Sequence, residues 1–315
     1  MSEPVFRVLK PGLLSTLQDS GRTGYQRLGV SPCGAMDAFA FRLANRLVGN
    51  PDNNVSLEIT LAGAELEVVR DCEVALAGAD LGAHLGSKPL RCWENSFARR
   101  GQHLVLSRRR RGARAYLSVA GGFVAENVLG SGSTDLRNGW GGLHGRQLQR
   151  GDELFVQLSG RTDRCSSWAV RPEVLVEYHN PFLLRVLECS QSKLFGNETR
   201  QQLLAAEFTI SADSNRMGYR LEGPRLGTPK RELISEATPT GGIQVLPNGE
   251  ALLLMADRQT VGGYPKIAVL ISADIPKAAQ LSPGHRVRFQ AVSLEDAHQA
   301  LAKQQERLRL DLLER

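Results

Sequence analysis

The chain carries one polar motif twice, once near the start of each half. The stretch DSGRTGYQRLGV begins at Asp19, and the stretch DSNRMGYRLEGP begins at Asp213. Asp, Ser, Arg, Gly and Tyr occupy the same places in both stretches without a gap. Because similarity within one chain indicates repeated structural units, this feature predicts two related halves instead of one continuous domain.

Further pairs of segments follow in the same order along the chain. They are ExTxxG at Glu58 and Glu236, an apolar segment ending in Ala-Asp at Asp80 and Asp257, and QLQRGDELFVQ from Gln147 with QLSPGHRVRFQ from Gln280. The alternative is that similar β-turn chemistry arose independently in each half. The shared order favours a repeat.

The two halves are assigned to residues 1–170 and 171–315. The stretch RTDRCSSWAVRPEV has the composition of a linker and places the boundary near residues 165–180. The first half carries additional sequence, at roughly residues 85–114 and 124–145.

Short strands with frequent turns dominate the predicted secondary structure. The 315 residues include 32 Gly and 14 Pro, which suit turns between strands better than long helices. Strands are predicted at residues 55–61, 72–77, 103–106, 115–119, 154–157, 182–187, 207–210, 251–255, 267–271 and 286–290. Many short strands are typical of barrels and sandwiches. We therefore expect a mainly β protein with two related barrel halves and a few short helices.

Two helices are predicted from their terminal signals. The first begins after Asp37, has apolar residues four positions apart, and ends at Gly49. The second closes the chain, because Ser293 and Asp296 resemble a capping box and apolar positions continue to Leu312. Its many charged residues indicate a peripheral helix.

The charge and cysteine content limit the classes of function. The net charge is +6, and a run of four arginines, Arg108–Arg111, contributes to it. This run is typical of an anion patch or, more simply, of a solvated loop between strands, since no aromatic residues interleave it. The five cysteines, at positions 33, 72, 92, 165 and 189, form no CxxC pair, and the N-terminus lacks a signal-peptide apolar region. We expect a cytoplasmic protein without nucleic-acid or membrane partners.

The densest group of chemically versatile residues is MADRQTVGGYPK, residues 255–266. An apolar strand leads into Asp257 and Arg258, which are candidate catalytic residues as a base and as a clamp for a carboxylate or phosphate. The candidate substrate-binding residues that follow are Gln259, Thr260, Gly262, Gly263 and Tyr264. Glycines permit close backbone approach to a ligand. The alternative is an Asp–Arg turn network that only holds a loop.

Residues elsewhere in the second half extend this candidate site. Arg216 and Tyr219 belong to the repeated motif and are candidates for substrate binding, or for a structural role. Glu236 is a third candidate catalytic residue, as an acid–base partner of Asp257, or a turn-capping residue. Gln244 follows the adjacent Thr-Pro-Thr-Gly-Gly turn and is a candidate for lining the same cavity.

Several common catalytic signatures are absent from the sequence. There is no GxxxxGK[ST] phosphate loop and no GxSxG nucleophile motif, and the six histidines lack metal-ligand spacing. The glycine-rich stretch at 130–146, which contains Asp135, Arg137 and Trp140, is either a long structured loop or a further candidate for carrying chemistry. No metal ligands are therefore assigned.

Taken together, the motifs resemble one family. The stretches PGLLSTLQDSGRTGYQRLGVSPCGAMD, LANRLVGNPDNNVSLEITLAG, AYLSVAGGF, SNRMGYRLEGP and MADRQTVGGYPKIAVLISAD are similar to the C-subunit family of 5-oxoprolinase, also called the KipA-like or biotin-dependent carboxyltransferase-like family. The family shares its pattern with the second carboxyltransferase region of urea carboxylase. The resemblance covers nearly the whole chain and implies cyclophilin-like β-barrels.

The resemblance also implies an activity. Members of the family work with two other proteins, the KipI-like B subunit of 5-oxoprolinase and its A subunit, to open 5-oxo-L-proline to L-glutamate while hydrolysing ATP. ATP, with Mg²⁺ as a candidate companion, is expected at a site shared with or lying on a partner, and the chain alone is expected to be inactive. One alternative is a biotin-dependent carboxyltransferase acting on urea or a similar amide. The other is a non-enzymatic regulator that binds a KipI-like kinase inhibitor.

The two halves differ at the strongest candidate segment. Asp80 occupies the place of Asp257 in the first half, but Leu-Gly follows it instead of Arg-Gln-Thr. This asymmetry predicts that the site lies in the second half and is completed by a partner.

Overall fold

The computed structural model describes residues 2–157, 167–175, 178–229, 233–309 and 312–314. The chain forms two compact units. Unit 1 contains Met1–Arg22, Cys33–Leu175 and Arg307–Arg315, and unit 2 contains Thr23–Pro32 and Val176–Glu306. Part of the predicted linker, including Cys165, lies outside the described residues.

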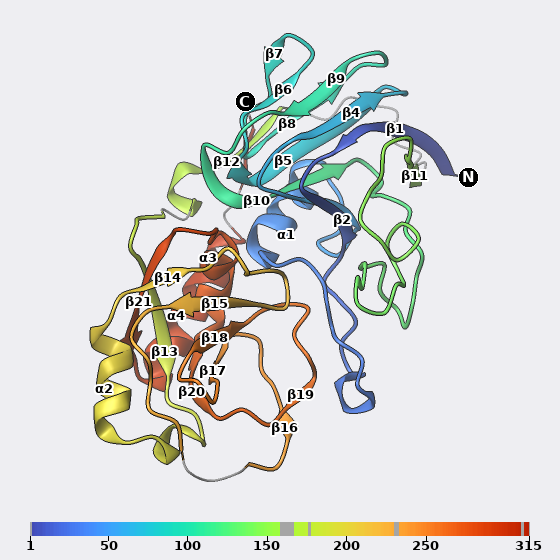
Figure 1. The fold of residues 1–315 in the computed structure, drawn as a ribbon. Coiled ribbons are helices and arrows are strands. Elements are labelled where there is room, and N and C mark those ends of the chain that lie inside the picture. Colours follow the sequence, from blue (N-terminus) through green and yellow to red (C-terminus); the bar gives the residue numbers. More distant parts are fainter. Residues whose placement is uncertain (1, 158–166, 176–177, 230–232, 310–311, 315) are drawn as a thin grey trace. The chain divides into compact units, whose positions relative to one another are not determined.

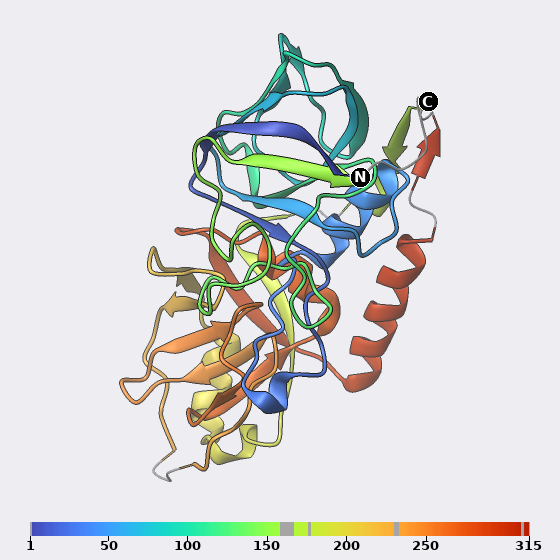
Figure 2. The same cartoon turned by 90° about the vertical axis from the view of Figure 1, so that its right-hand side faces the viewer.

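Unit 1 is built from two sheets. The six-stranded sheet has the order β11-β1-β4-β9-β6-β7, and the seven-stranded sheet has the order β2-β3-β10-β5-β8-β12-β22. The strands are β1 (Ser2–Pro11), β2 (Leu14–Gln18), β3 (Ser56–Thr60), β4 (Ala64–Val68), β5 (Cys72–Asp80), β6 (Ala83–Leu85), β7 (Lys88–Pro89), β8 (Glu94–Ala98), β9 (His103–Leu106), β10 (Arg111–Val119), β11 (Glu153–Gln157), β12 (Trp168–Val170) and β22 (Leu312–Glu314). Figure 2 shows the last strand of the chain, β22, beside β12, with which it pairs in antiparallel register.

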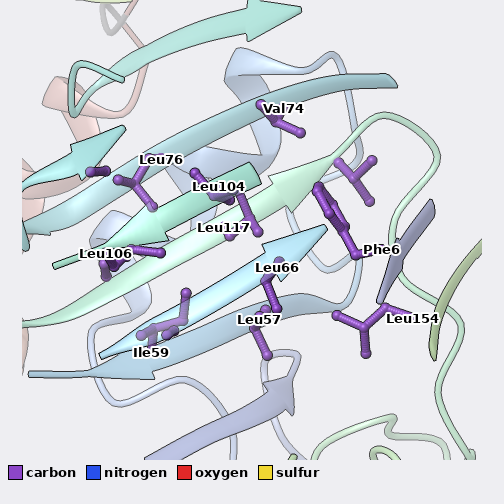
Figure 3. Close-up of a cluster of buried hydrophobic side chains, with 14 of the residues drawn as sticks. Phe6, Leu57, Ile59, Leu66, Val74, Leu76, Leu104, Leu106, Leu117 and Leu154 are labelled. Carbon is purple, nitrogen blue, oxygen red and sulfur yellow. The ribbon is translucent and has the colours of Figure 1, made fainter. Parts of the chain in front are cut away.

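One hydrophobic cluster joins the two sheets of unit 1. Side chains from β1, β4, β9 and β11 of one sheet meet side chains from β3, β5 and β10 of the other (Figure 3). Phe6, Leu57, Leu66 and Leu117 are at most 1% exposed. Fully burying a side chain of this size contributes roughly 1.5–3 kcal/mol, so this cluster is the main stabilising feature of unit 1.

The first predicted helix is confirmed as α1 (Ala38–Leu47). The Asp37 side chain accepts a hydrogen bond from the backbone N–H of Ala40 at 2.9 Å, which is the capping contact that the sequence predicts. Its apolar face, including Phe41 and Ala44, packs against Ala77 and Tyr116 of the seven-stranded sheet. A short 3₁₀ helix, η2 (Pro172–Val174), also belongs to unit 1.

Unit 2 is a closed seven-stranded barrel. Its order is β13-β20-β17-β18-β15-β14-β21, and a two-stranded ribbon, β16–β19, accompanies it (Figure 1). The strands are β13 (Phe182–Leu187), β14 (Phe208–Ile210), β15 (Gly218–Glu222), β16 (Glu236–Ala237), β17 (Gly242–Val245), β18 (Ala251–Leu254), β19 (Val261–Gly262), β20 (Lys266–Leu270) and β21 (Arg286–Ala291). The helical segments are η1 (Gln26–Leu28), η3 (Ser192–Leu194), α2 (Asn197–Ala205), η4 (Ser272–Asp274), α3 (Ile275–Ala279) and α4 (Leu294–Arg307).

The second predicted helix is α4, and its start is confirmed. Ser293 Oγ accepts from the backbone N–H of Asp296 at 3.0 Å, and Asp296 Oδ2 accepts from the backbone N–H of Ser293 at 3.1 Å. The predicted end was wrong, because the helix ends at Arg307 and Leu312 lies in β22. Pairing with β12 competes with helix continuation at that end.

The mainly β prediction is confirmed, and each strand range predicted from the sequence overlaps a strand of the structure. The second half closes into a barrel, while the first half distributes its strands over two sheets around one core. The run Arg108–Arg111 lies between β9 and the start of β10 with all four side chains exposed. None of the cysteines that the structure describes is in a disulfide. Within the described residues, no helix is both long and apolar enough to span a membrane.

Candidate functional site

The barrel strand β18 leads directly into the predicted site. Its partner β15 pairs Gly218 with Leu254, and two hydrogen bonds extend this pairing beyond the end of β18. The N–H of Met255 donates to the carbonyl of Met217 at 2.9 Å, and the N–H of Asp257 donates to the carbonyl of Arg216 at 3.0 Å. The backbone therefore places Asp257 opposite Arg216.

Asp257 and Arg216 form a buried, two-pronged ion pair. Arg216 Nε lies 2.8 Å from Asp257 Oδ2, and Nη2 lies 2.9 Å from Oδ1. The Arg216 and Asp257 side chains are 3% and 10% exposed, respectively. Because both carboxylate oxygens accept from one guanidinium group, the pair fixes the orientation of both side chains. This geometry favours a positioning role for Asp257 over the predicted role of general base.

Arg258 connects the β16–β19 ribbon to the end of the barrel. Its Nε donates to the carbonyl of Thr238 at 2.8 Å. The N–H of Thr238 donates to the carbonyl of Thr260 at 3.0 Å, and its hydroxyl donates to the carbonyl of Gln259. Ser31, from the short N-terminal segment of unit 2, donates to the carbonyl of Arg258 at 3.2 Å. Arg258 thus anchors the ribbon through backbone contacts.

The ribbon brings Gly262 close to two amide side chains. β19 pairs Gly262 with Glu236 of β16. A methyl group on Gly262 would lie 2.8 Å from Gln259 Nε2 and 3.0 Å from Gln244 Nε2. Contacts below 3.0 Å require neighbouring atoms to move, so an alanine at this position would displace the end of the Gln259 side chain and press on that of Gln244.

Lys266 closes the predicted segment 255–266, but the sequence assigned it no role of its own. It is 5% exposed, and its Nζ lies 2.6 Å from Oε1 of Glu236, whose side chain is 45% exposed. Its backbone N–H donates to Gln191 Oε1 at 2.8 Å. A lysine is seldom this deeply buried, and the available signal was its place at the start of the apolar segment KIAVL.

A β-bulge places Lys266 against Gln244. β17 and β20 pair Ile243 with Ala268 and then Gln244 with Lys266, so that Ile267 is the additional residue on β20. A bulge bends its strand and redirects the side chains beside it. We refer to Glu236, Gln244, Gln259, Gly262 and Lys266 as the Lys266 cluster.

The side chains of the other predicted residues have different surroundings, although the carbonyl of Tyr264 accepts from Gln244 Nε2 at 3.4 Å. Tyr219, on β15, is 1% exposed and lies opposite Leu253 in the barrel wall. Tyr264 is 43% exposed and contributes, with Gly263, to a shallow surface pocket of about 340 Å³. Thr260 contacts the ribbon through its carbonyl. The structure therefore separates the predicted residues into an ion pair, a backbone anchor and a polar cluster.

Two chemical classes of site find little support in the described residues. No three His, Cys, Asp or Glu side chains gather there as a metal site requires. Burial raises the pKa of the Cys72 thiol to about 12 and raises the pKa of Cys92 as well. A thiol with a raised pKa is a poor nucleophile, so these two cysteines are packing residues.

Residues 28–291 match the family described as "Carboxyltransferase domain, subdomain A and B". The chain is 39% identical to the C subunit of 5-oxoprolinase from Escherichia coli strain K12 over 302 residues, which cover 96% of each chain.

Solved structures of similar proteins share this fold. The urea amidolyase of K. lactis is 31% identical with a TM-score of 0.90, covering 96% of this chain and 20% of that one. The protein TTHA0988 is 35% identical with a TM-score of 0.83, and the match covers 91% of this chain. The chain spans a little over half, 56%, of TTHA0988. The protein therefore belongs to the carboxyltransferase-domain family, as a relative of the 5-oxoprolinase C subunit.

Proposed function

We propose that this protein is the C subunit of an ATP-dependent 5-oxoprolinase, in which it works with the A and B subunits. The observation that carries the proposal is the 39% identity to the E. coli protein over 96% of both chains. In this role the protein contributes to opening 5-oxo-L-proline to L-glutamate, and it is inactive without its partners.

The chemistry of the substrate defines what a site must provide. 5-Oxo-L-proline is a cyclic amide that bears a carboxylate, and resonance stabilises its carbonyl against attack by water. Ring opening forms a C–O bond from water, breaks the C–N bond and delivers a proton to the departing nitrogen. Such a site needs a cation for the carboxylate, polar groups directed at the amide and a group that moves a proton.

The Lys266 cluster supplies these types of group in one place. Lys266 provides a cation, and Gln244 and Gln259 provide amide groups beside the backbone of Gly262. Glu236 contacts Lys266 while nearly half of its side chain faces solvent. A carboxylate in that position can exchange a proton between the site and water. Within the proposal, Asp257 and Arg258 hold the walls of the site in place.

The charged residues of the candidate site are already engaged by other groups of the described chain. Asp257 and Glu236, the carboxylates that the sequence offers for Mg²⁺, already face Arg216 and Lys266. The guanidinium groups of Arg216 and Arg258 bind a carboxylate and a backbone carbonyl. We therefore propose that ATP and its metal ion are held by a partner protein, and we assign no step on this chain to them.

The test is reconstitution with the purified A and B subunits. The expected result is release of glutamate from 5-oxo-L-proline that requires ATP and all three proteins. Glu236→Gln is expected to lower kcat and to change KM little. The substitution removes a proton-transfer group but keeps the size of the side chain. Arg258→Ala is expected to lower kcat/KM, because the ribbon loses its anchor. Absence of ATP-dependent glutamate release from the mixture of all three proteins contradicts the proposal.

A second function has support from the comparisons. The matching family is described as a carboxyltransferase domain, and the fold matches urea amidolyase with a TM-score of 0.90. A carboxyltransferase would move a carboxyl group from carboxybiotin, held by a separate carrier, to the nitrogen of urea or a similar amide. Incorporation of labelled bicarbonate into urea in the presence of a biotin carboxylase and carrier would favour this function.

A further inference from the structure

Gln244 has a buried oxygen with unused hydrogen-bonding capacity. The residue is 0% exposed, and its Nε2 donates to the carbonyl of Tyr264 at 3.4 Å. That carbonyl can only accept, so the contact assigns the amide nitrogen to this side and the oxygen to the other. Among the described residues, nothing donates a hydrogen bond to Gln244 Oε1. Leaving such an atom unsatisfied is costly, and buried oxygens of this kind usually have a partner.

Lys266 has unused donors in the same region. Its ammonium group carries three N–H donors, and in the described part of the chain its one ion-pair partner is Glu236 Oε1. That contact is short, at 2.6 Å, but its angles do not meet those of a hydrogen bond. A 5% exposed ammonium group is costly to desolvate unless it is well paired.

The strand register brings these two groups together. Gln244 and Lys266 are directly opposite in the β17–β20 ladder. Gly262 lies against the amide of Gln244, and its ladder partner Glu236 contacts the ammonium group. The unused acceptor and the unused donors therefore belong to two residues that are paired in the barrel and that both approach residues of the β16–β19 ribbon.

We infer that Gln244 Oε1 and Lys266 Nζ recognise a small ligand that presents an amide N–H next to a carboxylate. The N–H donates to Gln244 Oε1, and the carboxylate accepts from Lys266. A cyclic amide acid such as 5-oxo-L-proline presents these groups on neighbouring ring positions. The choice of this ligand rests on the proposed function, but the pairing of acceptor and ammonium group rests on the structure alone. The competing interpretation is that the two groups bind ordered water only.

The first arm of the test compares ligands on the unmodified protein. Binding of 5-oxo-L-proline to the reconstituted complex is measured by calorimetry without ATP. Two analogues are measured in the same way: the γ-lactone, in which oxygen replaces the N–H, and 2-pyrrolidinone, which lacks the carboxylate. Each analogue is expected to bind at least about tenfold more weakly than the lactam acid, because each leaves one buried group unpaired. Equal binding of all three overturns the inference without any variant.

The second arm assigns each preference to a residue. Gln244→Met is expected to remove the preference for the lactam over the lactone and to keep the preference for the carboxylate. Lys266→Met is expected to remove the preference for the carboxylate and to keep the preference for the lactam over the lactone. Gln304→Met and Lys277→Met remove the same groups elsewhere in unit 2, where these residues contact the carbonyls of Ala273 and Leu183. Both control variants are expected to keep both preferences.

The two arms separate failure of the inference from failure of the proposed function. Binding can be measured without turnover. If the complex hydrolyses 5-oxo-L-proline but its Gln244 and Lys266 variants retain both preferences, only the inferred pair is contradicted. That outcome supports the interpretation that the two groups bind ordered water. A complex that binds the lactam acid with both preferences but releases no glutamate contradicts the proposed function and leaves the recognition pair supported. If a variant unfolds, the ligand comparison on the unmodified complex still decides whether such recognition exists.

Discussion

At the residue scale, two carboxylates that the sequence grouped as catalytic candidates have different surroundings. Both oxygens of Asp257 accept from Arg216, and the side chain is 10% exposed. Glu236 contacts Lys266 and is 45% exposed. A residue fixed by a buried guanidinium group suits positioning, whereas a residue between an ammonium group and solvent suits proton transfer.

The Arg216–Asp257 pair predicts a specific pattern in a double-mutant cycle. Asp257→Asn or Arg216→Met alone is expected to lower the free energy of unfolding by about 3 kcal/mol, because the remaining buried charge loses this ion pair. The double variant is expected to recover part of that loss. Urea unfolding monitored by circular dichroism measures all four proteins, and strictly additive losses would show that the pair is not coupled.

Gly262 and Gly263 offer a matched comparison at neighbouring positions. A methyl group at Gly262 meets two amide nitrogens at 2.8 and 3.0 Å, while at Gly263 the nearest atom is Ser235 Oγ at 3.3 Å. Overpacking a closely filled region costs about 1–3 kcal/mol. Gly262→Ala is therefore expected to raise KM for 5-oxo-L-proline in the reconstituted complex by about tenfold. Gly263→Ala is expected to change it less, and equal effects would argue against close packing at Gly262.

The sequence predicted most of the candidate residues but not how they group. Gln244, Glu236 and Gln259 were nominated from their places after strands and turns, and the structure puts all three in the Lys266 cluster. The burial of Lys266 depends on a bulge opposite Gln244 and was not predicted. A bulge is decided by the pairing of two strands, and the sequence of one strand does not reveal it.

At the element scale, signals within a few residues were predictable, and long-range pairings were not. The starts of α1 and α4 follow from Asp37 and Ser293, whose capping contacts lie within three residues. The β16–β19 ribbon has only two residues in each strand and is recognisable only after it pairs. The repeated motif also has different contacts in each half. Arg22 donates to the backbone carbonyls of Val128 and Ser133, whereas its counterpart Arg216 binds the side chain of Asp257.

The cap of α1 makes a prediction about stability. Asp37→Ala is expected to cost about 1 kcal/mol, because the N–H of Ala40 loses its acceptor. Asp37→Asn keeps an acceptor in place and is expected to have a much smaller effect. The free energies of unfolding in urea compare the two variants. An equal loss for both would mean that the charge of Asp37, and not the cap, stabilises the helix.

An ion pair in the turn before β11 is expected to contribute to the loss of folding stability at low pH. Hydrogen bonds from Arg146 hold the pKa of Asp152 below its usual value, with both Nη–Oδ distances at 2.8 Å. Because the folded pKa is depressed, this contribution to stability is present above the unfolded pKa of about 3.9. It is lost as the pH falls through the folded pKa. Asp152→Asn is expected to show a shallower loss of stability below about pH 4, and parallel pH profiles of the two proteins would contradict this role.

At the scale of the whole molecule, the two halves that share the sequence repeat contain different structural features. Unit 1 contains the large hydrophobic cluster between two sheets, and unit 2 contains the barrel with the Lys266 cluster. The first-half counterpart of Glu236 is Glu58, which is 1% exposed and accepts from the Tyr116 hydroxyl at 2.7 Å. A carboxylate enclosed in this way suits a structural role, so Glu58 gives unit 1 no counterpart to the half-exposed carboxylate of Glu236.

The most direct test of this account is the effect of Lys266 on turnover by the reconstituted complex. We predict ATP-dependent release of glutamate from 5-oxo-L-proline by the unmodified complex. Replacing Lys266 by Met is expected to lower kcat/KM by at least about tenfold, since the substrate carboxylate loses its cation, while Lys277→Met keeps full activity. A Lys266→Met complex as active as the unmodified one would contradict the placement of the site in the Lys266 cluster.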